Sequence, residues 1–215
     1  MSYTDPAVAY QRVMIEKGQE GSYQQVGNFK VIGTQFLFGD QLTGAAYVGN
    51  QMSSNIKLGY NMFNQTVELY MNENNLKIVK SPAELDSFVI LSGQSDFIKN
   101  NLSFHSSKNY PSSLKDCFLQ ILYKGEKYSL FKSYNAILDY VSTNYIQSEL
   151  RQFTTEFLYY YYDHQKKSFK KLKLSKRKLN EEFSSKNIPD NLVEDAAFDI
   201  QPEIAAQIFF QFINN

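Results

Sequence analysis

The chain has few of the residues that most metal and enzyme sites use. Among 215 residues there are one cysteine, two histidines and no tryptophan. The single cysteine, Cys117, excludes a disulfide within the chain and a thiolate metal cluster. Neither His105 nor His164 is followed or preceded by further ligands at metal-binding spacing. The sequence therefore predicts no metal and no cofactor.

The chain also lacks a long apolar run and an excess of one charge. No stretch approaches the roughly 20 apolar residues of a membrane-spanning helix. Lysine plus arginine and aspartate plus glutamate both number 22, so the formal net charge is zero. Because nucleic-acid binders neutralise phosphates, this balance argues against a nucleic-acid partner. Residues 1–10 lack the features of a signal peptide, which leaves a cytoplasmic protein or the mature part of an exported one.

Motifs of nucleophilic and nucleotide chemistry are missing as well. The sequence has no G-x-S-x-G elbow, no P-loop and no dinucleotide glycine fingerprint. Cys117 opens an apolar strand, where a small packing residue is expected. We therefore predict a protein that is not an enzyme and has no catalytic residues. A hydrolase built around His105, His164 or Cys117 is the third of three functional hypotheses.

Aromatic residues are abundant, with 16 tyrosines and 17 phenylalanines, and they follow a strand pattern. Residues 56–71 predict a β-hairpin closed by Asn64 and Gln65, with Met62 opposite Val67 and Tyr60 opposite Leu69. The apolar residues of both arms then share one face: Leu58, Tyr60, Met62, Val67, Leu69 and Met71. This pattern predicts an antiparallel sheet with one buried face.

Two further hairpins are expected later in the chain. A second spans residues 117–132, with Gly125 and Glu126 as a two-residue turn and Tyr123 opposite Tyr128. A third spans residues 156–174 and loops through residues 163–167. Between the first and second hairpins, residues 92–113 are polar and predict a long surface loop.

Helices are expected only at the two ends. Asp5, Pro6 and Gly18 provide start and stop signals for a helix over residues 5–17. Ser175 caps another short helix, residues 192–197 suggest one or two helical turns, and Pro202 begins a last helix over residues 202–214. An apolar stripe at helical period predicts its packing face: Ile204, Ala205, Ile208, Phe209, Phe212 and Ile213.

Together these elements predict an α+β fold. Its centre is an antiparallel meander of successive hairpins, either open or curved like a barrel, with a short N-terminal helix and C-terminal helices packed on the sheet. The expected organisation is an N-terminal helix and connector (1–27), an antiparallel β domain with the polar loop at 92–113 (28–174), and a docked C-terminal helical segment (175–215).

The third hairpin provides the candidate surface for a partner. Its first arm contains four consecutive tyrosines, and its loop and second arm are rich in lysine. The candidate residues are Tyr159, Tyr160, Tyr161, Tyr162, Lys166, Lys167, Lys170, Lys171 and Lys173. Exposed tyrosines stack on partners, and lysines contact anionic surfaces. The alternatives are sheet packing for the tyrosines and a solvated edge, neutralised by the acidic C-terminal third, for the lysines.

Several segments resemble a family of uncharacterised proteins from Bacteroidota-type bacteria. The similar segments are VIGTQFLFGD (31–40), GAAYV (44–48), IKLGYNMFNQTVELY (56–70), YKGEKYSLF (123–131) and FQFIN (210–214). In that family a "GxPFL" strand precedes an "lkYN" hairpin. The chain departs from the pattern at Gln35, where proline is frequent, and in residues 92–113.

The resemblance implies an exported protein, because family members usually carry an export or lipoprotein signal. It places the protein in the periplasm, on the cell surface or outside the cell, with a lipoprotein anchor or outer-membrane association in the native form. It transfers no catalytic residue. The first hypothesis is therefore a non-enzymatic binding or accessory subunit for a protein or envelope partner. The alternative is a carrier that curves its sheet around a small apolar ligand.

Overall fold

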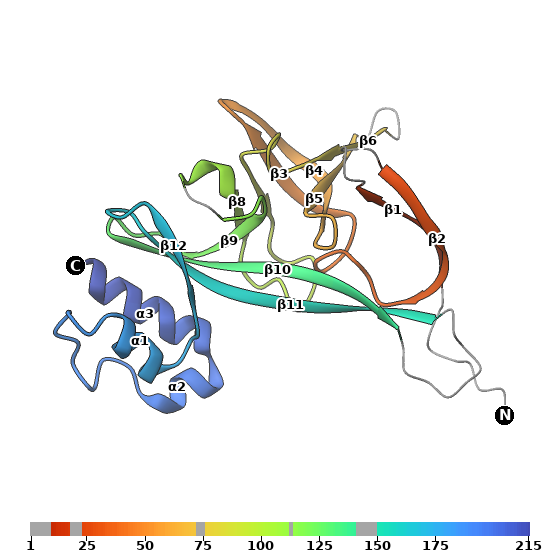
Figure 1. Cartoon of the computed structure of the whole chain (residues 1–215). Coiled ribbons are helices and arrows are strands. Elements are labelled where there is room, and N and C mark those ends of the chain that lie inside the picture. The colour runs from red at the N-terminus through yellow and green to blue at the C-terminus, as the bar shows by residue number, and fades with distance from the viewer. Residues whose placement is uncertain (1–9, 18–22, 72–75, 112–113, 141–149) are drawn as a thin grey trace.

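The computed structural model describes residues 10–17, 23–71, 76–111, 114–140 and 150–215. Within these ranges twelve strands belong to one sheet, and three short α-helices pack near its C-terminal strands. Figure 1 shows the helices in one layer beside β9–β12, while β1 and β2 lie at the opposite end of the long β10–β11 ribbon. The antiparallel sheet and the docked C-terminal helices are thus as predicted.

The strands account for most of the described chain. Their bounds are β1 (Tyr10–Lys17), β2 (Tyr23–Ile32), β3 (Leu42–Val48), β4 (Gln51–Asn61), β5 (Thr66–Met71), β6 (Leu76–Lys80), β7 (Ser87–Ile90), β8 (Leu102–Ser106), β9 (Phe118–Tyr123), β10 (Tyr128–Tyr140), β11 (Leu150–Asp163) and β12 (Ser168–Leu172). The helices are α1 (Lys176–Glu182), α2 (Asp195–Ile200) and α3 (Pro202–Asn214). A 3₁₀ turn follows β8 at Ser107–Asn109.

The sheet is open and nearly all antiparallel. The strand order is β1-β2-β11-β10-β9-β8-β7-β3-β4-β5-β6, and β12 pairs with β11 beside this path. The exception to the antiparallel pattern is the pairing of β2 with β11, which is parallel. This pairing joins the N-terminal hairpin to a strand about 120 residues later in the chain, so the order differs from a simple meander.

The predicted N-terminal helix is wrong over residues 10–17, where the chain forms β1. The remainder of that prediction, residues 5–9, lies outside the described residues. β1 pairs antiparallel with β2, with Tyr10 opposite Val31 and Lys17 opposite Tyr23. The β-branched Val13 and Ile15 favour a strand. Pairing with β2 outweighs the helix start and stop signals at Asp5, Pro6 and Gly18. The predicted connector is also shorter than expected, because β2 already begins at Tyr23.

The hairpin of β4 and β5 has the predicted faces but a different register. Tyr60 lies opposite Val67 and Leu58 opposite Leu69, so the loop has four residues, 62–65, instead of two. A shift of two residues leaves every side chain on its expected face. The longer loop forms because the Asn61 side chain accepts hydrogen bonds from the Phe63 and Asn64 N–H groups, a local turn that asparagine favours.

The residues expected as a polar loop at 92–113 contain β8 and the 3₁₀ turn. β8 pairs with β7 and β9, and Phe104 is fully buried. The strand is inconspicuous in the sequence because His105 and two serines surround its one large buried side chain. Residues 92–101 remain a loop, which Ile98 anchors in the core.

The larger core packs against β3–β5 and β7–β10 and is filled largely by aromatic rings. Phe88 and Phe104 stack at 4.6 Å between ring centroids, and the Tyr60 ring lies 5.5 Å from each of them. The buried Tyr60 hydroxyl donates to Gln65 Oε1 at 2.7 Å. This interior, which a ligand carrier would need to keep open, is occupied by side chains of the protein itself.

A second core lies between the helices and the β9–β12 end of the sheet. Its buried residues include Leu130 and Tyr161 from the sheet and Phe183, Phe209 and Phe210 from the helical segment. Ser175 caps α1 as predicted, because its side chain accepts the Lys178 N–H. No helix in the described ranges is long and apolar enough to cross a membrane.

The buried face of α3 is rotated relative to the predicted stripe. Ala205, Ala206, Phe209, Phe210 and Ile213 are buried, whereas 51% of Ile204 and 44% of Ile208 remain exposed. Two polar anchors explain the rotation. Glu203 and Asn214 are eleven residues apart, close to three helical turns, and therefore lie on the same side of α3. Both contact β10, as described below, and they fix which side of the helix faces the sheet.

Candidate partner-binding surface

The hairpin of β11 and β12 carries eight of the nine candidate residues, and Lys173 directly follows the end of β12. Its loop comprises residues 164–167, close to the prediction, and Asp163 lies opposite Ser168. The Asp163 side chain accepts the N–H groups of Gln165 and Lys166 at 3.0 and 2.9 Å. Lys167 closes the loop with a left-handed φ of 52°. The turn has the same plan as the one after Asn61, where Gln65 has a φ of 53°.

Tyr159 and Tyr161 face the helices, and each donates its hydroxyl to a glutamate. Tyr159 bonds Glu203 at the start of α3 at 2.8 Å, and Tyr161 bonds Glu182 at the end of α1. Each glutamate also binds the lysine that lies directly opposite its tyrosine in the sheet. Lys132 on β10 reaches Glu203 at 2.6 Å, and Lys170 on β12 reaches Glu182 at 2.7 Å.

These two tyrosine–glutamate–lysine groups hold the helices on the sheet. Burial, reinforced by the neighbouring carboxylate, raises the pKa of Tyr159 and that of Tyr161 well above the usual value. Hydrogen bonds from Lys170 and Tyr161 lower the pKa of Glu182. Both hydroxyls therefore stay protonated at neutral pH, and the lowered pKa keeps Glu182 charged, which suits a charge-assisted contact.

The Lys132 ammonium is also surrounded by rings. It lies 4.3 Å from the Phe157 ring centroid, 4.8 Å from that of Tyr134 and 5.7 Å from that of Tyr159. Cation–π contact adds to the ion pair with Glu203. Lys132 therefore fills the aromatic site formed by these three rings.

Tyr160 and Tyr162 point to the opposite face of the hairpin. Tyr162 is buried against Phe131 and Phe169, and its ring also contacts Tyr110 at 5.0 Å between centroids. Tyr160 is half-buried near Phe169. The structure thus places all four tyrosines in packing or hydrogen bonds within the protein.

The lysines of the hairpin fall into two groups. Lys166 and Lys170 form ion pairs with Asp163 and Glu182. Lys167, Lys171 and Lys173 are exposed and make no ion pair with any described residue. Lys171 lies opposite Tyr160, on the face away from the helices. Part of the basic charge is therefore neutralised internally, and these three lysines, here called the free lysines, face solvent.

The groups that a hydrolase would need occupy structural positions. His105 is partly buried, and its Nδ1 lies 3.1 Å from the Tyr110 hydroxyl. Nε2 of His164 lies 2.8 Å from Ser129 Oγ. Burial raises the pKa of the Cys117 thiol to about 11, which disfavours the thiolate that nucleophilic chemistry requires. Among the described residues, no three histidine, cysteine or acidic side chains are grouped to hold a metal ion.

His105 predicts a specific pH dependence of stability. Burial, and then the charge of Lys124, lower the pKa of His105 below its ordinary value of 6.5. Between the two pKa values the unfolded chain binds more protons than the folded one, so stability falls as the pH decreases through 6.5. We expect the wild type to lose more unfolding free energy than H105N between about pH 7.5 and about pH 5 in urea titrations. Parallel losses in both proteins would contradict this.

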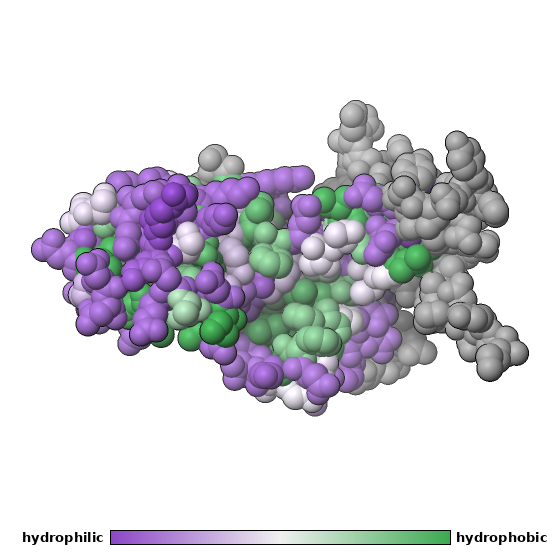
Figure 2. Space-filling model, turned by 90° about the horizontal axis from the view of Figure 1, so that it is seen from below, coloured by the Kyte–Doolittle hydropathy of each residue, from purple (hydrophilic) through white to green (hydrophobic). Residues whose placement is uncertain are grey.

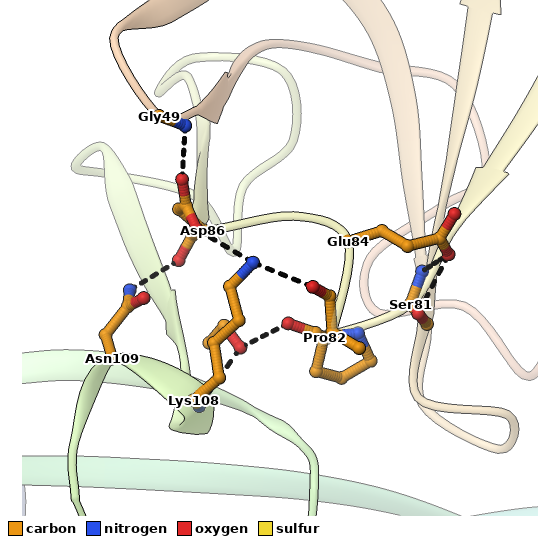
Figure 3. A network of polar contacts seen from close by, with 9 residues as sticks. Gly49, Ser81, Pro82, Glu84, Asp86, Lys108 and Asn109 are labelled. Atoms are coloured by element: carbon orange, nitrogen blue, oxygen red, sulfur yellow. Dashed lines mark hydrogen bonds and ion pairs between the residues drawn. The ribbon is translucent and has the colours of Figure 1, made fainter.

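A further polar cluster, shown in Figure 3, joins three loops. The Asp86 carboxylate accepts the Gly49 N–H and pairs with Lys108 at 2.8 Å, while Asn109 donates to the Asp86 backbone oxygen. The hydrogen bond from Lys108, followed by that from Gly49, lowers the pKa of Asp86. All of these contacts hold the three loops together.

Comparison of the chain with protein-family models, curated proteins and solved structures finds no match. Any function of the candidate surface must therefore be argued from the geometry of its residues.

One exposed region of the hairpin lies just before the nine candidate residues. Phe157 is 51% and Leu158 40% exposed, next to the tyrosine run. The sequence signal for it is a strand that is apolar on both faces, and the structure adds that an arm of fourteen residues, β11, pairs with an arm of five, β12. A long strand beside a short one leaves part of its edge uncovered.

Proposed function

We propose that this protein is a non-enzymatic binding or accessory subunit that contacts a protein or envelope partner through the β11–β12 hairpin. In line with the family resemblance, the proposed location is the periplasm, the cell surface or the extracellular space. The observation that carries the proposal is the set of free lysines, Lys167, Lys171 and Lys173, which project from a hairpin fixed to the helices on its other face.

The contrast between the two groups of lysines supports this proposal. Lys170 is used to hold α1, so its charge is neutralised within the protein. The free lysines are three positive charges on a short rigid element, and the nearby glutamates are already engaged by other partners. Such a cluster attracts an acidic surface and raises the rate of encounter with it. The partner we propose therefore presents acidic groups.

Charge reversal tests the proposal in cells that naturally make the protein. The variant K167E/K171E/K173E should shift the tagged protein from a discrete complex to the monomer, in which the chain itself accounts for 24.9 kDa, as measured by size-exclusion chromatography with light scattering after gentle purification. The matched control K99E/K115E/K124E changes the formal net charge equally, at exposed lysines elsewhere. It should leave the complex intact. A wild-type protein that is only monomeric, or equal loss in both variants, would refute the proposal.

A further inference from the structure

One edge of β11 is covered at both ends and open in between. β10 pairs with β11 along residues 151–163 on one side. On the other side, β2 pairs with residues 150–152 and β12 with residues 159–163. No strand in the described residues pairs with this edge between Phe153 and Leu158. Figure 1 shows this part of β11 as the lower border of the long ribbon.

The register determines which backbone groups point to the open edge. The His164 N–H donates to the Lys127 carbonyl of the adjoining chain at 3.0 Å. Since alternate residues of an antiparallel strand bond to the same neighbour, even-numbered residues of β11 face β10. Thr155 and Phe157 therefore direct their N–H and C=O groups outwards. Phe153 also points outwards, but its carbonyl lies beside Gly33, where an added Cβ would be only 3.2 Å away.

The side chains along this edge are exposed and partly apolar. Residues 154–158 are all exposed, and Phe157 and Leu158 are among the most exposed large apolar residues of the described chain. Figure 2 views the molecule from the side of this edge and shows apolar residues gathered across the middle of that face. Exposed apolar residues beside unpaired backbone groups are typical of a strand-binding site.

Two edge strands of the sheet carry lysines that discourage strand addition, whereas this segment has none. β12 and β6 are edge strands in the described residues, and they carry Lys170 and Lys171, and Lys77 and Lys80. Lysine on an edge strand discourages pairing with another chain. The segment Phe153–Leu158 reads FTTEFL and contains no lysine and no proline. Its β-branched and aromatic residues favour a strand instead.

The flanking strands restrict what can enter the gap. Six residues of strand span roughly 20 Å, and β2 and β12 occupy the line of the edge beyond them. In a symmetric dimer a second copy would bring its own β11 there, whose fourteen residues would collide with β2 and β12. Only a short extended segment that enters and leaves the gap away from the sheet plane fits.

We propose that a partner protein inserts an extended segment of about six residues into this gap, as an added strand on β11. The inference rests on the proposed function and specifies how the partner binds. Glu156 is exposed and makes no ion pair with any described residue, so a basic side chain on the segment would lie next to it. On the other face, an apolar side chain would pack between Thr155 and Phe157.

Amide-resolved NMR tests this inference on the full-length protein. In the free protein, we expect the Thr155 and Phe157 amides to exchange with solvent at least about tenfold faster than those of Glu156 and Leu158, which bond to β10. The probe is a short synthetic peptide that alternates valine and threonine around one central lysine. It should slow exchange at Thr155 and Phe157, whereas the same peptide with N-methylated backbone should not.

Two variants locate the binding. T155P removes an outward N–H and leaves the bonds to β10, because proline is tolerated where an edge N–H faces solvent. F157K adds the charge that protects the other edges. Both should abolish binding of the peptide while the amide spectrum remains that of a folded protein.

Three results would overturn the inference: equally slow exchange at all four amides in the free protein, absence of peptide binding up to its solubility limit, or binding that neither variant changes. These results are separate from the test of the proposed function. If lysine reversal disrupts the complex but the edge fails these tests, the partner binds at the lysines and not by strand addition. If the edge binds the peptide but lysine reversal has no effect, the proposed role of the free lysines is wrong.

Discussion

Replacing Phe104 by alanine is expected to lower the unfolding free energy by about 3–5 kcal/mol. Phe104 is fully buried, stacks on Phe88, and its ring centroid lies 5.5 Å from that of Tyr60 and 6.3 Å from that of Tyr134. Its removal leaves a cavity among rigid rings that cannot collapse to fill it. Urea unfolding followed by circular dichroism measures the loss.

The matched control is F97A. Phe97 belongs to the loop that precedes β8, and 80% of it is exposed. Its ring stacks on that of Phe38, at 6.5 Å between centroids, and because most of it is exposed its replacement should change stability by roughly 0.5 kcal/mol or less. Similar losses in both variants would show that the aromatic cluster is not the main core of the sheet.

Asn214, at the end of α3, is expected to have the largest effect among the polar residues. Its Oδ1 accepts the N–H groups of Lys127 and Tyr128, both at 2.9 Å. Its Nδ2 donates to the carbonyls of Tyr128 and Phe210 at 3.0 and 2.7 Å. With about 0.5–1.5 kcal/mol for each hydrogen bond, N214A should lower the unfolding free energy by roughly 2–4 kcal/mol.

The aspartate variant separates the two halves of this contact. N214D keeps both acceptor bonds but loses both donors and places a carboxylate near two carbonyls, so its stability should lie below that of the wild type. Asn215, the neighbouring residue, is exposed and provides the control N215A, which should behave as wild type. Calorimetry measures all three variants. A neutral N214A would mean that α3 is held by its apolar face alone.

The first and third hairpins show how far local chemistry could be predicted. The faces of β4 and β5 follow from alternation, which a shift of two residues does not change. The loop lengths follow from Asn61 and Asp163, because each bonds the N–H groups two and three residues ahead. Asp163 marks the start of the predicted third loop, whereas the loop predicted for the first hairpin, Asn64 and Gln65, is two residues shorter than the one that begins after Asn61.

The second hairpin depends on a contact that its own sequence does not contain. Gly125 and Glu126 predict a two-residue turn, but Tyr123 lies opposite Leu130 in the structure, so six residues, 124–129, separate this last pair of the hairpin. Asn214, whose bond to the Tyr128 N–H spans 86 residues of chain, fits into this loop. An added Cβ on Gly125 would lie 2.3 Å from Asn214 Oδ1, so the glycine serves this contact instead of a tight turn.

The candidate surface was similarly predictable only in its local part. The alternation of the tyrosine run correctly separates Tyr159 and Tyr161 from Tyr160 and Tyr162. Which glutamates accept their hydroxyls depends on helix docking, since Glu203 lies 44 residues after Tyr159. Likewise, the open edge of β11 depends on β2, which comes from the other end of the chain.

Site-specific photocrosslinking in cells that naturally make the protein tests the central claim most directly. A photoreactive residue is placed in turn at Lys171 on β12, at Leu158 beside the open edge, and at Lys99 in the loop before β8 as a control. A protein that binds a partner through the β11–β12 hairpin should give the same discrete adduct from Lys171 and Leu158 and none from Lys99. The absence of an adduct from both hairpin positions, or the same adduct from Lys99, would contradict the account.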